Sequence, residues 1–530
     1  MPIVTVTNVG ALGIMHDIPS YELPPEAFTL GANVRFKDNR AEKFLGHKAV
    51  FGAPSGAPYF LLCCPSSSAV HWLYGGLTKV WGTDMTSHAD ISKTATTYTT
   101  NQDTKWNGVM FGGIPVINNG NEVPQVWAPI SLTQLLIDIP NWGTWPTANT
   151  RCRVLRSFRN FLIAMDITEA SRDPLALAWS HPAPAGAVPS SWNYTDPTKD
   201  ATKIQLSESG GAILDCLRLG GTNVVYKEDW IYSMQFVGGE EIFRFDTAFR
   251  DIGMMATNCM AFVPGRGHLV VTHDDIVIHD LKNMRSILDG RRRTTLFATI
   301  DASSKQRSFV VVDYKRTEVW FCYPETGAVQ PTRALTWNWV TEQLGDRQLG
   351  AETAHIGLGV VNPSAVANTW DSDGNSWDSD LTIWDQRTYD PAFTSMLMGR
   401  SAATAALYLA DETNQFAGSN FTSFVERKGI SIVGKDRQGN PKVDLNSVKF
   451  ISRVLPRMKA SGAVQIYVGG QMDKEAAIQW NGPFNFNPNT DLEIFADVTA
   501  RLPAIRVEST ADVSWELYGY DLDMKIIGRY

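Results

Sequence analysis

Histidine and aspartate cluster once in this sequence in a pattern that could bind a metal ion. His273, Asp274 and Asp275 are consecutive, and His279 follows in the same short stretch. Imidazole and carboxylate groups are the usual ligands of zinc in proteins. The surrounding residues, LVVTHDDIVIHDL, read instead as two apolar strands with Asp274 and Asp275 in the turn between them. The two imidazoles need not then face the same side, so we predict a hairpin turn rather than a metal site.

A second group of acidic residues could bind calcium, because hard oxygen ligands at alternating positions suit that ion. It consists of Asp371, Asp373 and Asn375, followed by Asp378 and Asp380. The glycine of this stretch comes too early for an EF-hand loop, and no glutamate closes the loop. We therefore predict successive turns or short strands here, with a weak structural cation as the alternative.

Three consecutive arginines, Arg291 to Arg293, could contact phosphate groups of a nucleic acid. They follow Asp289-Gly290, a dipeptide typical of hairpin turns. On a strand, at most two of the three would share a face. Salt bridges between subunits, or a charged strand edge that blocks pairing, explain them more simply.

No common catalytic motif occurs in the sequence. It contains no G-x-S-x-G and no H-E-x-x-H, and Gly265-Arg266-Gly267 and Gly357-Leu358-Gly359 lack the further residues of a phosphate-binding loop. The six cysteines show no C-x-x-C spacing, and we interpret the adjacent Cys63 and Cys64 as packing residues. We predict a protein that is not an enzyme, with no catalytic residue, cofactor or bound metal.

Composition sets further limits. The chain has 530 residues, of which 44% are hydrophobic and only 19% charged, with a formal net charge of −8. This length exceeds that of a single core, so at least two domains are expected. No overall positive field would draw the protein onto DNA, and any DNA contact must be local or non-adhesive. The N-terminus lacks the features of a secretory signal, and no apolar run is long enough for a membrane-spanning segment.

Repeated hairpins dominate the sequence and would position any site. Each combines two apolar strands with a tight turn of Gly, Asp or Lys, and all but one of the clearest examples carry a Trp or Tyr in the second strand. These examples are Val70–Trp81, Val224–Phe245, Leu269–Leu281, which lacks the aromatic residue, and Ser308–Tyr323. A hairpin cannot bury its aromatic face alone, so such hairpins must stack. Their spacing of roughly 40–50 residues is that of propeller blades. We predict an all-β chain with a propeller-like domain of five or six blades, with a pair of sandwiches as the alternative.

The hairpins divide the chain into four parts. We predict an N-terminal arm over 1–55 that joins a platform, a propeller over 56–350, a connector over 351–400 that contains Trp370, Trp377 and Trp384, and a β-sandwich-like platform over 401–530. Helix is expected only over Ser131–Ile139 and in parts of 401–410.

Several short segments, in their order along the chain, resemble tail nozzle proteins of short-tailed bacteriophages, also called packaged-DNA stabilisation or tail tubular proteins. The resemblance extends over most of the chain. The segments are Asn33-Val34-Arg35-Phe36 with Glu42 to Gly46, Trp106-Asn107-Gly108-Val109 with Pro124-Gln125-Val126-Trp127, Arg159–Ala164 with Ala178-Trp179-Ser180 and Trp192, Val468-Gly469-Gly470, Trp480, Phe484 to Pro488, Arg501, Trp515 to Tyr520, and Gly528-Arg529.

The resemblance implies a structural virion protein of the tail, made and assembled in the bacterial host cytoplasm. It implies a homohexameric tube below the head-to-tail adaptor ring, which continues the DNA channel, retains the packaged genome and anchors tail fibres or spikes. Double-stranded DNA would pass through the lumen without sequence-specific binding, which suits the acidic balance of the chain.

Two other functions remain as alternatives. A carbohydrate-binding or glycan-cleaving propeller would use Trp370, Trp377 and Trp384 as stacking platforms. A receptor-binding protein associated with the fibres would belong to the same virion.

Overall fold

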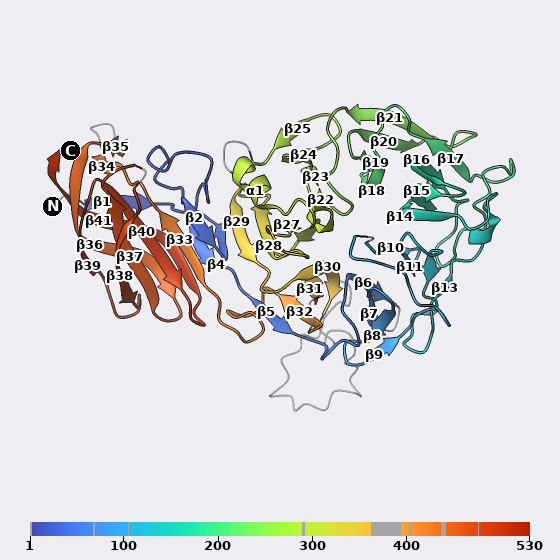
Figure 1. Cartoon of the computed structure of the whole chain (residues 1–530), viewed down its shortest axis with the longest axis horizontal. Helices are drawn as coiled ribbons and strands as arrows, with labels where there is room; N and C mark the ends of the chain where they lie inside the picture. The colour runs from blue at the N-terminus through green and yellow to red at the C-terminus, as the bar shows by residue number, and fades with distance from the viewer. Residues whose placement is uncertain are drawn as a thin grey trace.

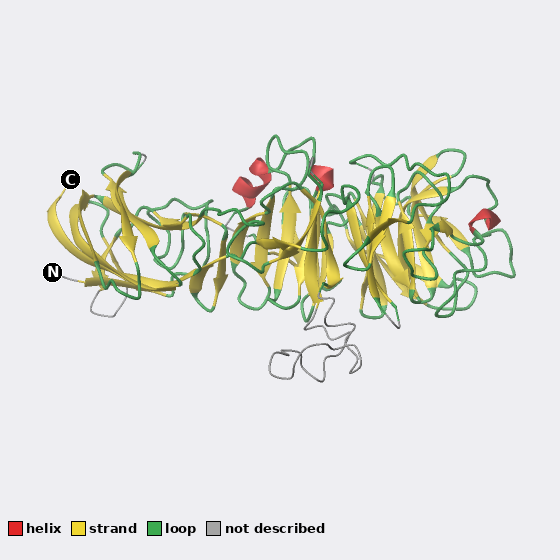
Figure 2. Cartoon of the chain, turned by 90° about the horizontal axis from the view of Figure 1, so that it is seen from below, coloured by secondary structure: helices red, strands yellow, loops and turns green. Residues whose placement is uncertain are grey.

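The computed structural model consists almost entirely of β-strands arranged in two parts, a ring of small sheets and a separate sandwich (Figure 1). The two parts lie in a row, so the molecule is elongated (Figure 2). Both chain ends lie in the sandwich (Figure 1). The structure describes residues 3–66, 69–103, 105–288, 292–361, 394–401, 404–435, 441–474 and 476–529.

Seven four-stranded antiparallel units, here called blades, form the ring; six are separate sheets, and one is the end of a larger sheet. The first three are β6 to β9 (Phe60–Pro65, Val70–Gly75, Val80–Thr83, His88–Asp90), β10 to β13 (Asn107–Phe111, Ile114–Asn118, Gln125–Val126, Ile137–Asp138) and β14 to β17 (Arg151–Phe158, Phe161–Thr168, Arg172–Trp179, Thr202–Gln205). The next three are β18 to β21 (Ile213–Leu219, Thr222–Lys227, Ile231–Phe236, Phe243–Phe249), β22 to β25 (Met260–Val263, Gly267–Val271, Ile276–His279, Met284–Ser286) and β26 to β29 (Phe309–Asp313, Glu318–Tyr323, Arg333–Asn338, Leu344–Gln348).

The seventh blade closes the ring with a strand from the N-terminal region. It contains β30 to β32 (Thr353–Val360, Thr394–Arg400, Ala406–Ala410), and its fourth strand is β5 (His47–Ala49), which pairs with β32. Each first strand of a blade contacts the first strand of the next, and β30 contacts β6. The ring is therefore a closed seven-bladed propeller, here called the propeller.

The predicted all-β, propeller-like fold is confirmed, but the count of five or six blades is wrong. The connector predicted over 351–400 is also wrong at both of its ends, because β30 and β31 belong to the seventh blade. The propeller thus extends to β32, beyond the boundary expected at residue 350. Trp370, Trp377 and Trp384 lie outside the described residues.

Aromatic packing explains why the predicted hairpins form. Tyr74 of β7 pairs with Trp81 of β8, and their rings stack with centroids 5.4 Å apart. A β-carbon at Gly56 or Gly76 would lie 2.1 or 2.5 Å from the Trp81 ring, so these glycines make room for it. In the turn from β22 to β23, Gly267 has a φ of +108°, and a β-carbon there would lie 2.1 Å from the carbonyl oxygen of His279. The glycines of Gly265-Arg266-Gly267 therefore serve a tight turn.

Two sheets packed face to face form the second part, here called the platform. One contains β2 (Leu30–Ala32), β33 (Ser423–Arg427), β40 (Leu502–Ser509), β37 (Val464–Gln471) and β38 (Gln479–Phe486). The other contains β1 (Ile3–Thr7), β3 (Val34–Lys37), β4 (Arg40–Lys43), β41 (Trp515–Arg529), β36 (Ser447–Ala460) and β39 (Ile494–Ala500). Their facing apolar residues, among them Val454, Ile466, Val507 and Leu522, build one core. The predicted sandwich is confirmed. Of the arm predicted over 1–55, β1 to β4 join the platform, whereas β5 joins the propeller.

Blade six and the platform share a sheet. The strand order β26, β27, β28, β29, β3, β4, β41, β36, β39 runs without a break from the propeller into the platform, and Asp346 of β29 pairs with Val34 of β3. A small hairpin of β34 (Ile432–Lys435) and β35 (Pro441–Val443) lies beside β1.

Helix is scarce, as predicted, but its positions differ. Residues 131–136 form turns that lead into β13, and 406–410 form β32, so the helices expected there are wrong. Trp127 explains the first case, because its indole Nε1 donates to the carbonyl oxygens of Ser131 and Gln134 and fixes an irregular loop. The α-helix of the described chain is α1 (Arg293–Thr299), and the short 3-10 turns are Trp142–Thr144 and Lys305–Arg307.

Candidate functional site

The residues of the predicted histidine and aspartate turn do not gather around one point. Asp274 and Asp275 lie in the turn between β23 and β24, as predicted. His273 and Asp274 are exposed, whereas Asp275 and His279 are buried. Asp275 accepts hydrogen bonds from Ser286 and Arg293. Within the described ranges, no three His, Cys, Asp or Glu side chains gather closely enough to hold a metal ion.

His279 instead belongs to a buried hydrogen-bond chain between blades four and five. The amide of Leu281 donates to His279 Nδ1 at 3.4 Å, so His279 Nε2 carries the proton and donates to the Tyr226 hydroxyl at 3.0 Å. That hydroxyl donates to His268 Nδ1 at 2.7 Å, and His268 Nε2 donates to the carbonyl oxygen of Arg218 at 3.0 Å. Burial lowers the pKa of His268 and of His279 to about 4, so both rings are neutral at pH 7. This chain joins two blades.

The arginine run serves the fold where it is described. Arg292 is buried and its Nη2 lies 3.0 Å from Asp346 Oδ2, while Arg293 begins α1 and pairs with Asp275. The strand expected for Arg292 and Arg293 is therefore wrong, and both make ion pairs within the chain. Arg291 and the turn Asp289-Gly290 lie outside the described residues, as does the acidic stretch from Asp371 to Asp380.

The predictions about the cysteines, about membrane-spanning segments and about glycan binding have different outcomes. Cys64 is buried and Cys63 is partly buried in β6, and burial raises the pKa of Cys63 to about 11, which agrees with a packing role. No helix in the described part of the chain is long and apolar enough to cross a membrane. The glycan alternative relies on three tryptophans outside the described residues, so it stays a hypothesis.

A buried cluster of charges, here called the joint, fixes the platform to the propeller. Arg35 of β3 donates through Nε to Glu318 Oε1 of β27 at 2.6 Å and through Nη2 to Asp411, which follows β32. Arg316 Nε lies 3.0 Å and Arg347 Nη1 3.7 Å from the same Asp411 carboxylate. Burial alone would raise the pKa of Asp411, but Arg35, Arg347 and Arg316 together hold it below its usual value. The joint therefore connects blades six and seven to the platform.

Two further residues, Asn33 and Asn107, also make hydrogen bonds between units of the fold. Arg35 lies in Asn33-Val34-Arg35-Phe36, and Asn33 Nδ2 donates to Gln348 and to the carbonyl oxygen of Thr422. Asn107 lies at the start of β10, where its amide bonds the carbonyl oxygen of Arg153 and the amide of Leu155 in the next blade. These residues connect one unit of the fold to the next.

The outer face of the platform carries a row of four paired residues, here called the outer row. Phe495 of β39 lies opposite Arg453 of β36, Arg453 opposite Asp523 of β41, and Asp523 opposite Ile3 of β1. Residues directly opposite in antiparallel strands share a face. Arg453 Nε lies 2.9 Å from Asp523 Oδ2 and its Nη1 2.8 Å from Glu493 Oε2. The row is thus an ion pair flanked by two apolar side chains.

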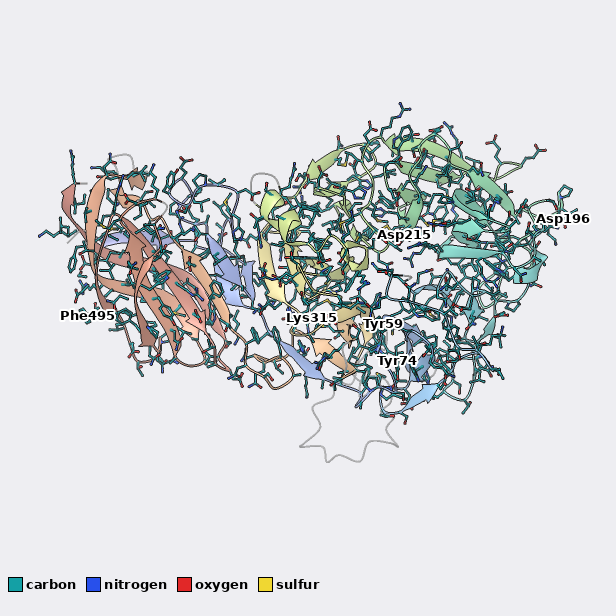
Figure 3. All side chains as sticks on the ribbon, viewed as in Figure 1. Tyr59, Tyr74, Asp196, Asp215, Lys315 and Phe495 are labelled. Carbon is teal, nitrogen blue, oxygen red and sulfur yellow. The ribbon has the colours of Figure 1, made fainter. Side chains whose placement is uncertain are left out.

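Both ends of the outer row are exposed. Phe495 is 66% and Ile3 55% exposed, and neighbouring Leu492 is 85% exposed. Figure 3 shows Phe495 at the edge of the platform far from the propeller. At the C-terminal end of β41, Ile526 and Ile527 are 48% and 53% exposed. Large exposed apolar side chains on paired strands are a feature of protein interfaces.

Sequence reasoning missed the outer row. Its one available signal is the alternation in IFADVTA, where Phe495 occupies a position that the polar residues Asp497 and Thr499 share. A phenylalanine on the polar side of an alternating strand marks a surface position to test as a contact.

Comparisons with known proteins identify no relative by sequence: no protein-family model and no curated protein matches the chain. Solved structures similar to it include the AfRom2 CNH domain, with 8% identity and a TM-score of 0.36 over 70% of this chain and 98% of that chain. BBS1N, solved in complex with ARL6DN, has 9% identity and a TM-score of 0.38 over 70% of this chain and 96% of that chain. The WD40 domain of Toxoplasma gondii coronin has 7% identity and a TM-score of 0.37 over 72% of this chain and 87% of that chain. These scores are low, so the description of the propeller above rests on strand pairing within this chain.

Proposed function

We propose that this chain is a structural virion protein, the subunit of a tail nozzle of a short-tailed bacteriophage. In this role it forms a ring of copies below the head-to-tail adaptor, continues the DNA channel, retains the packaged genome and anchors fibres or spikes. The proposal is motivated by the short sequence segments, in their order along the chain, that resemble this family. Its structural support is the exposed surface of the platform.

Exposed apolar residues on the platform are the main support. Phe495, Ile3 and Leu492 lie on or beside the outer row and are more than half exposed. The row also offers the Arg453–Asp523 pair, and charged pairs flanked by apolar groups are typical of interfaces that retain polar contacts. A second copy would cover these side chains. Rings form when two different patches of one chain meet head to tail and the rotation closes.

The joint supports a role in which the propeller and the platform keep a fixed position relative to each other. Arg35, Glu318 and Asp411 are buried and come from the platform and from two blades. A buried pair resists separation because breaking it leaves an unpaired charge in the interior. A propeller fixed in this way would keep its position relative to a ring formed by the platforms.

The proposed DNA path lies between subunits and not along the propeller axis. Lys105 Nζ donates to the carbonyl oxygens of Thr257 and Ser308, at 3.1 and 2.6 Å, from the opposite side of the ring. Arg156 of blade three donates to Asp215 of blade four at 2.7 and 2.8 Å. These side chains cross the region where the first strands of the blades meet, which leaves the surfaces between copies for DNA.

The experiment compares two surface changes that each replace an exposed apolar side chain by a glutamate. Phe495→Glu places a charge in the outer row, whereas Val340→Glu, at a propeller position that is 63% exposed, serves as the matched control. We expect the wild-type chain and Val340→Glu to form rings in the presence of the adaptor protein, as measured by light scattering. Phe495→Glu should stay monomeric with an unchanged unfolding midpoint. Assembly of Phe495→Glu at wild-type concentrations would contradict the proposed surface.

A further inference from the structure

A small polar cavity opens at the propeller axis, on the side where the first strands of blades two to four begin. Its volume is about 190 Å³, and its charged lining consists of Asp103, Lys105, Arg153, Asp166, Arg172 and Glu228. This volume is below the roughly 300–1,000 Å³ of pockets for drug-sized ligands. Any occupant is therefore small. Figure 3 shows Asp215 and Tyr59 on the inner side of the ring around this region.

The carboxylates of the cavity are already occupied. Asp166 receives two hydrogen bonds from Arg172, at 2.6 and 2.8 Å. Asp103 pairs with Arg307 at 2.9 Å. Glu228 Oε2 accepts the amide hydrogen of Ala212 at 3.3 Å, and Glu228 also lies near enough to Arg172 to raise the pKa of that arginine. Asp103 and Asp166 thus have arginine partners, while Glu228 lies near Arg172, which it shares with Asp166.

Arg153 and Lys105 are the two cations of the cavity that form no ion pair with a carboxylate among the described residues. Arg153 makes no hydrogen bond or ion pair through its side chain with any described residue, although it lines the cavity. Lys105 Nζ donates to two carbonyl oxygens, which are neutral, and an ammonium group has three donors, so one N–H remains. Asp215 is near, but its carboxylate already binds Arg156. The lining itself contains three acidic and three basic side chains. Because Arg307, which lies outside the lining, pairs with Asp103, Arg153 is left without an acidic partner among the described residues.

Both cations line the same cavity. Burial lowers the pKa of Lys105 to about 8; Cys259 and Asp215 act in the opposite direction, and the positive charge of Arg153 adds a smaller lowering. An anion placed between them would relieve both effects, because it favours the charged form of each group.

We propose that this cavity is a binding site for a small oxyanion, a carboxylate or a tetrahedral sulfate or phosphate group, held between Lys105 and Arg153. The guanidinium fork of Arg153 matches either group in a bidentate manner. The remaining N–H of Lys105 supplies the opposing contact. This site is separate from the platform surface and does not depend on the proposed tail function.

Calorimetric titration of the full chain with sodium sulfate and with sodium acetate, at an ionic strength fixed with sodium chloride, tests the site. The decisive variant is Arg153→Gln, because Arg153 makes no described bond whose loss would harm the fold. Arg151→Gln is the matched control, since Arg151 lies on the same strand, does not line the cavity and binds the carbonyl oxygens of Asn121 and Thr150.

We expect one or both anions to bind the wild-type chain and Arg151→Gln equally, and Arg153→Gln to bind about tenfold or more weakly, as the loss of a charged hydrogen bond implies. Preference for sulfate or for acetate tells which oxyanion geometry the cavity suits. Sulfate does not change its charge near neutral pH, so its affinity should fall as the pH rises through 8 and Lys105 loses its proton. The absence of binding by both anions, or equal binding by Arg153→Gln, would overturn the proposal.

Discussion

Arg35 and Glu318 lie 283 residues apart in the sequence and form a buried ion pair of 2.6 Å where the platform meets the propeller. Both side chains are almost fully buried, so their charges depend on each other and on Asp411. This pair makes the two parts of the molecule one mechanical unit. The predictions below start from this joint and then turn to the propeller.

Removing the charge of Asp411 should destabilise the protein strongly. In Asp411→Asn, three arginines lose their shared carboxylate in the interior, and breaking a buried pair costs about 3–5 kcal/mol. The midpoint of urea unfolding measures this loss. As a control, Asp138→Asn breaks the exposed pair with Lys93 and should cost less than about 1 kcal/mol. If both substitutions lower the free energy of unfolding equally, the joint stabilises the fold no more than an exposed ion pair does.

The free energy of unfolding should fall as the pH is lowered from about 6.5 to 4, because of the buried histidines of the propeller. The folded pKa values of His268 and His279, about 4, lie below the usual 6.5 because both rings are buried. Between these values the unfolded chain binds more protons than the folded chain, so this contribution to stability is complete above pH 6.5 and is lost as the pH falls through 4.

Unfolding midpoints measured from pH 8 to pH 4 test this dependence. His47, which burial and Arg347 hold neutral with a pKa of about 3, adds to the same slope. Substitution of the buried His279 by Gln should reduce the slope. A midpoint that stays constant down to pH 4 would contradict the neutral assignment of the buried imidazoles.

The thiols should react slowly in the folded protein. Burial raises the pKa of Cys259 to about 11 and that of Cys216 to about 12, so thiolate is scarce at pH 8. An aromatic disulfide reagent should modify the cysteines of the native chain over hours and all of them within minutes in denaturant. Rapid labelling of the native chain would mean that β6 or the blade cores open readily.

Local features of the sequence predicted the hairpins well, because alternating apolar residues and aromatic partners such as Tyr74 and Trp81 are close together in the chain. They could not predict the seventh blade. Its outer strand β5 comes from residues 47–49 and pairs with β32 at residues 406–410, so closure depends on contacts far apart in sequence. The joint was missed for the same reason, since nothing near Arg35 identifies Glu318 as its partner. Phe495 could have been noticed, because it breaks the polar side of an alternating strand.

Electron cryomicroscopy of the purified chain mixed with the adaptor protein tests the proposed assembly most directly. The account predicts closed rings with rotational symmetry in which Phe495 and Ile3 of the platform lie within contacts between copies. Single copies at every concentration, or rings whose contacts leave the platform surface exposed, would contradict it.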